Sequence, residues 1–484
     1  MNTSNSLFLT RMIAIVVGII ESAILFFTPQ PIRAGLDQCL FMLPAAVVMV
    51  LVVYPNILGL HKGGIALKIY YCVVMIRYMV LPWLILISKG KCGYYMPAVK
   101  SPYSYWFAII LMVIELFISI SVINKHYYIE EDKILNKIEM RKYPGKSISG
   151  VGVVVIGMLV LLLIVRANYV IPSMNIILIK DANADAGVWY EAIIMNCLKA
   201  FLFASIMQVI YKLRSAKDKF LYFFIAVVLA LLNFGIYFGS NRAYIVMTLI
   251  ATVFIYLHIY PEYKFVSLVA LIPVGVICVF TMFVNKQFGL EVSEMTSSVV
   301  DIAGVSNIIE LYVGGPWNYA SGLEAVTGRY LPDVGMIIAS FLQKFALLNI
   351  PGFKWLRHIE NSMTPMYGTD VYAWDAYHTS LGIYGNSQIL SGSTEILVMF
   401  GWIIGILMVF VYQYWVSKML IRIDCRAKHI NHDMRYKYMY VWLGVMFGMF
   451  YCYSPALLLW VWSKFAMFYW LLVYANDKFI FGRR

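Results

Sequence analysis

The sequence predicts an all-α polytopic membrane protein with about twelve transmembrane helices and one large external loop that carries short interfacial helices. Of its 484 residues, 62% are hydrophobic and only 13% are charged, and the mean hydropathy is +0.77. A soluble domain keeps roughly a quarter of its residues charged, so this chain could not cover a water-facing surface. Its apolar stretches are continuous rather than alternating, which excludes a membrane β-barrel. We expect residues 1–484 to form a single polytopic membrane domain.

Each predicted span holds about 20 mostly apolar residues, the length that crosses the hydrocarbon core of a bilayer as a helix. No small-residue cleavage site follows the first apolar stretch, so we expect a retained span rather than a signal peptide. A tight turn at Ser454-Pro455 separates the last two spans. The predicted spans are 8–28, 37–57, 65–88, 103–124, 149–167, 189–211, 220–238, 243–260, 265–285, 394–416, 438–454 and 457–476.

The net charge of +13 is concentrated in connections that fall on one side of these spans. Lys and Arg are dense in residues 125–146, 212–219 and 418–437. The positive-inside rule places these connections and both termini in the cytoplasm. Basic patches can also bind nucleic acid, but these are short loops that flank membrane spans. The predicted surroundings are therefore membrane lipid, and no nucleic-acid partner is expected.

One connection, residues 286–393 between predicted spans nine and ten, is much longer than the others and falls on the external side. A loop of this length is usually functional or disordered, and the high aromatic content of this one argues against disorder. Residues 296–312 and 335–350 have the apolar spacing of interfacial helices. The connection is therefore predicted to be a structured extracytoplasmic loop.

Aromatic residues alternate with acidic and amide residues in this loop, for example at Trp374, Asp375 and Tyr377. Rings stack on the CH-rich faces of sugars, while carboxylates and amides bond to their hydroxyls. These residue types therefore favour a carbohydrate-binding surface. For any single ring, a place in the interfacial aromatic belt is the simpler interpretation.

Several ionisable residues lie within or at the edge of predicted spans, where a charge is costly unless it is paired or hydrated. One interpretation is that they pair across helices, with Glu115 bound to Arg77 or to Lys199. The other is that they surround a hydrated cavity for a polar or anionic ligand. The residues are Glu21, Lys68, Arg77, Glu115, Lys199 and Lys464.

The segment Gly239-Ser240-Asn241-Arg242 is predicted to be a very short external turn with Arg242 at the head of the next span. A guanidinium near a helix N-terminus suits oxyanions, because both its forked geometry and the helix dipole favour negative charge. The simpler alternative is an Arg that snorkels to the membrane interface. Arg242 is therefore a candidate for binding a phosphate-containing ligand.

His378 lies in the external loop shortly before the chain re-enters the membrane. Histidine can accept a proton from a hydroxyl near neutral pH, although a histidine in a loop is more often an ordinary surface residue. His429 and His432 have a metal-like spacing, but they lie in a basic connection without other ligands. The seven cysteines have no paired spacing, so no metal site and no cofactor is predicted.

Architecture and motifs together resemble the Wzy-type polymerases of O-antigen and capsular polysaccharide repeat units, which are related to the O-antigen ligases. Phe238-Gly239-Ser240-Asn241-Arg242-Ala243 resembles the small-residue/Arg turn of that family, although Asn241 stands where many relatives have a small residue or Thr. Gly314-Gly315-Pro316 is similar to a turn in the family's large loop, and His378-Thr379-Ser380-Leu381 to its late His-containing segment. Glu395, Phe400-Gly401 and Gly405 resemble the pattern that opens the next span.

The resemblance implies a glycosyltransferase in the bacterial cytoplasmic membrane that polymerises undecaprenyl-diphosphate-linked oligosaccharides into capsule, exopolysaccharide or O-antigen at the outer face. It implies His378 as the base, Asp375 as its orienting partner or a rival base, and Arg242 as the diphosphate ligand. The chemistry is expected to be metal-independent. The expected partners are the lipid-linked substrate and a chain-length regulator and flippase of the same pathway. The predicted substrate-binding residues are Arg166, Asn241, Arg329, Trp374, Tyr377 and Glu395.

Three alternatives share much of this pattern. An O-antigen-type ligase would look almost identical at this level, because it differs mainly in the acceptor. A lipid-linked oligosaccharide flippase would have a similar number of spans, but would not need an external loop of a hundred residues. A solute transporter would more often show two similar halves and broken helices, and the sequence shows neither.

Overall fold

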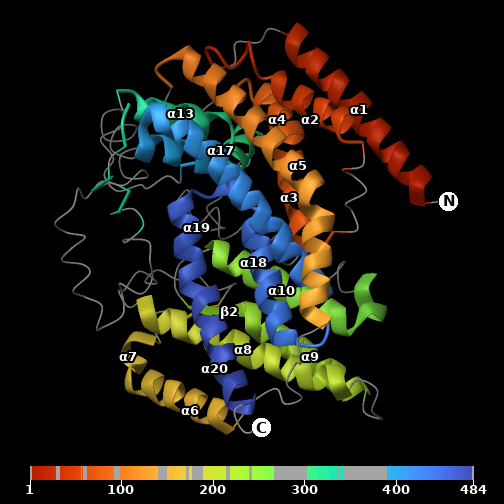
Figure 1. Ribbon diagram of the computed structural model, residues 1–484, viewed down its shortest axis with the longest axis vertical. Helices are drawn as coiled ribbons and strands as arrows, with labels where there is room; N and C mark the ends of the chain where they lie inside the picture. The colour runs from red at the N-terminus through yellow and green to blue at the C-terminus, as the bar shows by residue number, and fades with distance from the viewer. Residues whose placement is uncertain are drawn as a thin grey trace.

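The structure is a computed structural model, and it is mostly helical over the residues that it describes (Figure 1). An all-α chain with long apolar helices, as predicted, is therefore confirmed. The described residues are 3–28, 33–55, 57, 63–91, 99–139, 150–170, 174–176, 189–213, 219–238, 242–265, 302–328, 330–332, 334–335, 337–338, 341 and 390–481.

The first part of the chain forms α1 (Thr3–Phe27), α2 (Met42–Val53) and a third rod with a widened turn in its middle. That rod consists of α3 (Ile65–Met75), the π-helical turn η2 (Ile76–Val80) and α4 (Leu81–Ile87). Pro82 stands in the first turn of α4. Because proline has no N–H to donate to the preceding turn, it disfavours regular α-helical bonding there. The next helix, α5 (Pro102–Glu139), is 38 residues long.

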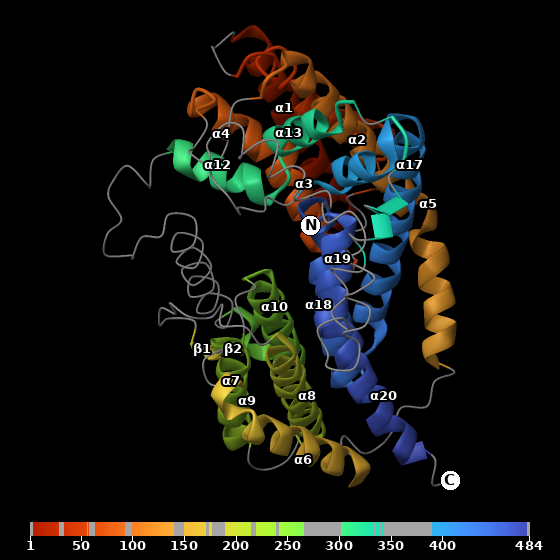
Figure 2. The ribbon, with the colours of Figure 1, turned by 90° about the vertical axis from the view of Figure 1, so that its left-hand side faces the viewer.

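The middle of the chain places two short strands among five helices (Figure 2). β1 (Met174–Ile176) and β2 (Ile236–Phe238) pair antiparallel, with Met174 opposite Phe238. β2 precedes α10 in the chain. The helices are α6 (Gly150–Val165), α7 (Ala167–Val170), α8 (Trp189–Leu213), α9 (Lys219–Gly235) and α10 (Arg242–Ile259), and the 3-10 turn η3 (Pro261–Tyr263) follows α10.

Two described helices of the predicted external loop pack among the spans. α12 (Ile302–Tyr312) confirms a helix within the predicted range 296–312 and packs beside α4. α13 (Pro316–Val326) was not predicted, and it is buried along its length except at Glu324. Gly315 caps α13 and Pro316 occupies its first turn, where its missing N–H costs nothing. Most of the predicted helix 335–350 lies outside the described residues.

α17 (Gly392–His429) reverses direction at Gly401, which has φ 68° and ψ 175°. A Cβ on Gly392 would lie 2.6 Å from the Tyr412 ring, and a Cβ on Gly405 would lie 3.2 Å from the Leu397 Cα. Residues 392–400 therefore run antiparallel to the rest of α17 for roughly 13 Å, at the rise of an α-helix. The sequence predicts an uninterrupted span over 394–416, so the structure corrects that prediction.

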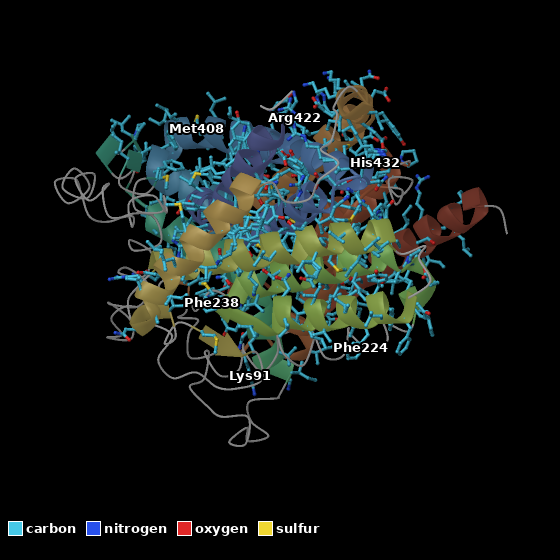
Figure 3. All side chains as sticks on the ribbon, turned by 90° about the horizontal axis from the view of Figure 1, so that it is seen from below. Lys91, Phe224, Phe238, Met408, Arg422 and His432 are labelled. Atoms are coloured by element: carbon cyan, nitrogen blue, oxygen red, sulfur yellow. The ribbon has the colours of Figure 1, made fainter. Side chains whose placement is uncertain are left out.

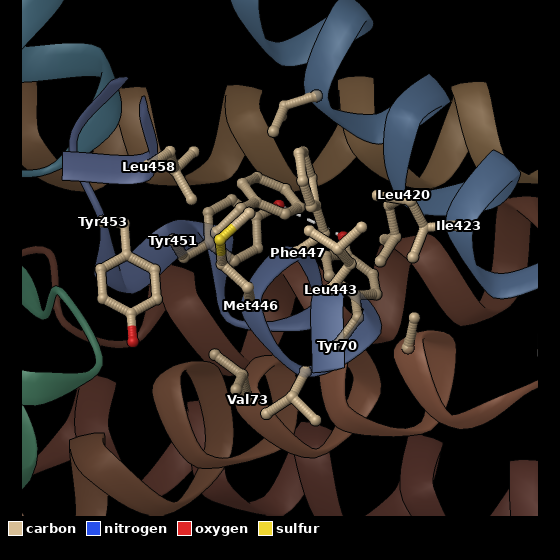
Figure 4. Close-up of a cluster of buried hydrophobic side chains, with 14 of the residues drawn as sticks. Tyr70, Val73, Leu420, Ile423, Leu443, Met446, Phe447, Tyr451, Tyr453 and Leu458 are labelled. Carbon is tan, nitrogen blue, oxygen red and sulfur yellow. Dashed lines mark hydrogen bonds between the residues drawn. The ribbon is translucent and has the colours of Figure 1, made fainter. Parts of the chain in front are cut away.

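The C-terminal helices complete the core. α18 (Met434–Gly448) is capped by Asp433, and α19 (Pro455–Val461) by Ser454, whose hydroxyl accepts a bond from the Leu457 amide. Between them lies the 3-10 turn η7 (Phe450–Cys452), and after them the π-helical turn η8 (Trp462–Met467) and α20 (Phe468–Phe481). Figure 4 shows buried side chains of α3, α17, α18, η7 and α19 in one cluster, with the hydroxyls of Tyr70 and Tyr451 3.2 Å apart.

Six helices in the described part of the chain are long and apolar enough to cross a membrane. They are Phe8–Phe27, Ile65–Ile87, Pro102–Ile138, Glu191–Leu213, Gly392–His429 and Pro455–Asp477. Four more predicted spans coincide with the shorter apolar helices 42–53, 156–165, 220–235 and 244–259. The range 438–454 falls on α18 and η7, and 265–285 lies outside the described residues except for Phe265. A membrane-embedded helical protein is therefore supported, while about twelve crossings stays a prediction.

Connections predicted to be cytoplasmic meet at one end of the bundle. Glu130 of α5 pairs with Arg422 of α17 at 2.9 Å, and Glu131 with Lys428 at 2.8 Å. The Asp424 carboxylate accepts bonds from the Gly64 and Leu67 amides and so caps α3. Figure 3 labels Arg422 and His432, which both belong to the basic connection 418–437, in the view from below. The predicted cytoplasmic connections 125–146 and 418–437 thus meet at one end, next to the start of α3.

Which side this end faces is open to a direct test. We expect reporter fusions after Lys137 and Lys428 to indicate the cytoplasm, and a fusion near Asp333 to indicate the outside, because the basic connections remain inside. Alkaline phosphatase and green fluorescent protein fused at each position measure the two outcomes. A cytoplasmic signal at Asp333 would reverse the orientation and remove the basis for chemistry on the outer face.

Candidate functional site

The predicted anion-binding turn follows a strand that α8 holds in place. Asn196 of α8 donates to the Phe238 carbonyl at 2.8 Å and accepts from the Phe238 amide at 3.3 Å. The Lys199 ammonium donates to the Ile236 carbonyl of the same strand. α10 begins at Arg242, directly after the turn. Both ends of β2 are therefore bonded to α8 just before the chain enters the turn.

Arg166 is attached to the same helix. Its Nε donates to Glu191 Oε1 at 3.0 Å, and Glu191 lies in the first turn of α8. The Arg166 side chain is 36% exposed, whereas that of Glu191 is fully buried. Leu163, Val170 and Phe238 share a small apolar cluster with residues of α8. Arg166 and the strand before Arg242 are thus brought to one helix, although they are far apart in sequence.

The other residues predicted for the site divide into two groups. Glu395 is fully buried in the first turn of α17, and its Oε2 accepts a bond from the Ala456 amide at 3.1 Å. This contact connects the start of α17 to the start of α19. The side chain of Arg242 lies outside what the structure describes. The remaining predicted residues also lie outside it: Asn241, Arg329, Trp374, Asp375, Tyr377 and His378.

A second polar group, buried among the spans, surrounds Arg77 and Glu115. Arg77 Nη2 lies 3.5 Å from Glu115 Oε2, and both side chains are fully buried. The Arg77 Nε donates to the Gly314 carbonyl at 2.9 Å, at the turn between α12 and α13. The predicted pairing of Glu115 with Arg77 is therefore confirmed, and the alternative pairing with Lys199 is wrong. Breaking a buried pair of this kind typically costs about 3–5 kcal/mol.

Tyrosines surround the Arg77 guanidinium. Its Cζ lies 4.4 Å from the centroid of the Tyr451 ring and 4.8 Å from that of Tyr319. The Tyr319 hydroxyl donates to Glu115 Oε2 at 2.5 Å, and the Tyr451 hydroxyl donates to Ser119 at 2.9 Å. The rings supply cation–π contacts, and their hydroxyls bond to the polar groups of α5. Arg77 Nη1 has no hydrogen-bond partner among the described residues.

Two short buried helices, α13 and residues 392–400 of α17, meet beside the polar group around Arg77 and Glu115. The Ser391 amide donates to Asn318 Oδ1 of α13 at 3.0 Å. A Cβ on Gly322 would lie 2.8 Å from the Thr394 side chain, so only glycine allows α13 this close to α17. The Ser393 hydroxyl donates to Glu115 Oε1. The bundle interior is therefore built from broken helices as well as from complete spans.

The other charged residues predicted to lie in the spans differ in exposure and in their contacts. Glu21 is 1% exposed, whereas Lys68 is exposed. The Lys464 ammonium lies 3.5 Å from the centroid of the Trp460 ring. Within the predicted set, Arg77 and Glu115 form an ion pair with each other. Within the described residues, no three His, Cys, Asp or Glu side chains lie close enough to hold a metal ion.

Comparison of this chain with protein-family models, with curated proteins and with solved structures gives no match.

Proposed function

We propose that the chain is a membrane glycosyltransferase that polymerises undecaprenyl-diphosphate-linked oligosaccharide repeat units at the outer face of the bacterial cytoplasmic membrane. The observation that carries the proposal is the arrangement around α8. This helix holds Arg166 through Glu191 and holds the strand before the Arg242 turn through Asn196. Arg166, a predicted substrate-binding residue, and the strand that precedes Arg242 are thereby attached to one helix.

The chemistry requires a cationic group for the leaving diphosphate and a base for the attacking hydroxyl. A sugar hydroxyl of one repeat unit attacks the anomeric carbon of the growing chain, and the bond from that carbon to the diphosphate oxygen breaks. Arg242 at the start of α10 would bind the diphosphate as its charge increases. His378 would take the hydroxyl proton, with Asp375 as its orienting partner or as a rival base.

A second candidate is a flippase or transporter for lipid-linked oligosaccharide. The observation that favours it is the pair of short buried helices, α13 and residues 392–400, whose N-terminal ends lie among the spans. Broken helices of this kind form the binding sites of many transporters. A ligase that transfers the glycan to a different acceptor is a variant of the first proposal, because the donor and the leaving group are the same.

Purified protein reconstituted in vesicles with lipid-linked repeat units distinguishes these activities. We expect chains of many repeat units and release of undecaprenyl diphosphate, measured by mass analysis of extracted lipids. Movement of unaltered units between leaflets without chain growth would support the transporter instead. Growth only on an added lipid acceptor would support the ligase.

A further inference from the structure

Lys199 carries a positive charge in the middle of α8 that no described carboxylate neutralises. Its ammonium donates to the carbonyl of Ile236, the first residue of β2. The described parts of the helices from α6 to η3 contain two acidic residues. Glu191 pairs with Arg166 at 3.0 Å, and Glu262 lies in η3, beyond the far end of α10. None of the ion pairs among the described residues includes Lys199.

The bond to Ile236 does not account for the charge of this side chain. A neutral amide donor, such as a glutamine side chain, could bond the same carbonyl without the cost of a charge in a spanning helix. An ammonium has three N–H donors, and the Ile236 carbonyl takes one of them. The other two suit a group with several negatively charged oxygens, such as a phosphate.

The position of Lys199 is one that a lipid headgroup can reach. Ile236 follows α9, whose 17 residues rise by about 25 Å, close to the thickness of the hydrocarbon core. α9 begins after the basic connection 212–219, so its end at β2 lies toward the outer face in the predicted topology. Lys199 is partly buried, and Met174 of the neighbouring strand β1 is 43% exposed. The ammonium therefore lies at the edge of the described helices and not deep in the core.

We propose that Lys199 is a substrate-binding residue whose ammonium binds a phosphate oxygen of the lipid-linked diphosphate. This inference rests on the proposed glycosyltransferase function, since that function supplies the diphosphate. The Arg166 charge is already matched by Glu191, so Lys199 adds the uncompensated positive charge to this side of α8. The bond to Ile236 keeps the ammonium beside β2 while its other donors contact the ligand.

Three variants separate the charge of Lys199 from its bond to Ile236. Lys199→Gln keeps a donor for the carbonyl but loses the charge, Lys199→Met loses both, and Lys199→Arg keeps both. Lys68→Gln is the matched control, because Lys68 is also a lysine of a spanning helix but is exposed near the start of α3.

The assay measures the Kd of each purified variant in lipid nanodiscs for undecaprenyl diphosphate, for undecaprenol and for phosphatidylglycerol, by native mass spectrometry. We expect Lys199→Gln and Lys199→Met to weaken undecaprenyl diphosphate binding by about 10–100-fold, the usual cost of losing one hydrogen bond to a charged group. Lys199→Arg should retain most of the affinity. Lys68→Gln should bind as the original protein does, and undecaprenol binding should be the same in every variant.

Binding is measured without chain growth, so failure of this inference and failure of the proposed function are distinguishable. If the unaltered protein forms no polymer, the glycosyltransferase proposal fails, while the Kd series still tests Lys199. An unchanged Kd in Lys199→Gln would overturn the inference, because the lysine would then only bond the Ile236 carbonyl. An equal loss of phosphatidylglycerol binding, or an equal loss in Lys68→Gln, would also overturn it, because the charge would then act on any anionic lipid.

Discussion

Replacement of Arg242 by alanine is expected to lower glycan polymerisation by about 10²–10³-fold, the usual cost of losing one charge-stabilising group in an active site. The guanidinium would no longer neutralise the diphosphate as the glycosidic bond breaks. The helix N-terminus of α10 would remain, so a small residual rate is expected. Chain length is measured on surface glycan and in vesicles, with the amount of protein in the membrane determined by immunoblot.

Two further variants show whether the effect belongs to the guanidinium. Arg242→Lys should recover only part of the activity, because an ammonium cannot offer a bidentate fork to a phosphate. Arg422→Ala is the matched control, since Arg422 pairs with Glu130 where the basic connections 125–146 and 418–437 meet. Full activity of Arg242→Ala would show that this arginine only anchors the helix at the interface.

Replacement of His378 by alanine is expected to lower the rate by about 10²–10⁴-fold, because a general base contributes that much to proton transfer. Assembly and export of single repeat units would continue, so short lipid-linked units should accumulate on the outer face. Gel and mass analysis of lipid-linked glycan measure the length distribution, and a membrane-impermeant reagent reports the leaflet.

The position of the accumulated units separates an enzyme from a transporter. A flippase needs no proton acceptor, so loss of His378 would leave its activity nearly unchanged. Units trapped on the cytoplasmic face would instead show that His378 takes part in transport, which would overturn its assignment as the base of polymerisation. Normal long chains would exclude His378 as the base and direct the search to Asp375 or Glu395. His429→Ala is the control, since His429 contacts Glu131 at the end with the basic connections.

Hydropathy predicted the positions of most described helices but not the course of the chain in the long connection. α13 contains Asn318, Ser321 and Glu324, which lower the average hydropathy of the segment to that of a polar loop. In the structure, the Asn318 amide and the Glu324 carboxylate accept bonds from the Ser391 and Ser101 amides, so the helix can be buried. An average over neighbours along the chain cannot detect partners that come from distant segments.

The reversal at Gly401 was missed for a related reason. Residues on both sides of it are apolar, so the pattern predicts one continuous helix over 394–416. The reversal depends on a positive φ at Gly401, and a Cβ there would lie 2.4 Å from the Tyr330 backbone. A glycine inside an apolar run is common in spans, so its presence alone does not predict a turn.

The interior polar group was predicted in part. A charge within a span needs a partner, and this argument predicted the pair of Arg77 and Glu115. Tyr319, Ser393 and Tyr451 could not be predicted, because tyrosine and serine are common throughout the chain and their selection depends on tertiary packing. Around α8, Arg166 was predicted as a substrate-binding residue, but its attachment through Glu191 became visible only in the structure.

Synthesis of the chain separates Glu115 from its partners in time. Glu115 precedes Tyr319 by 204 positions and Ser393 by 278 positions. η2 and α5 therefore enter the membrane before Tyr319 and Ser393 are made, and Arg77 of η2 is the partner already present to neutralise the carboxylate. Until the last third of the chain is inserted, the open hydrogen-bonding sites of this pair must be satisfied by water or by the insertion machinery. A truncated chain that ends before Tyr319 would keep this polar patch in the bilayer, and only the completed chain buries it.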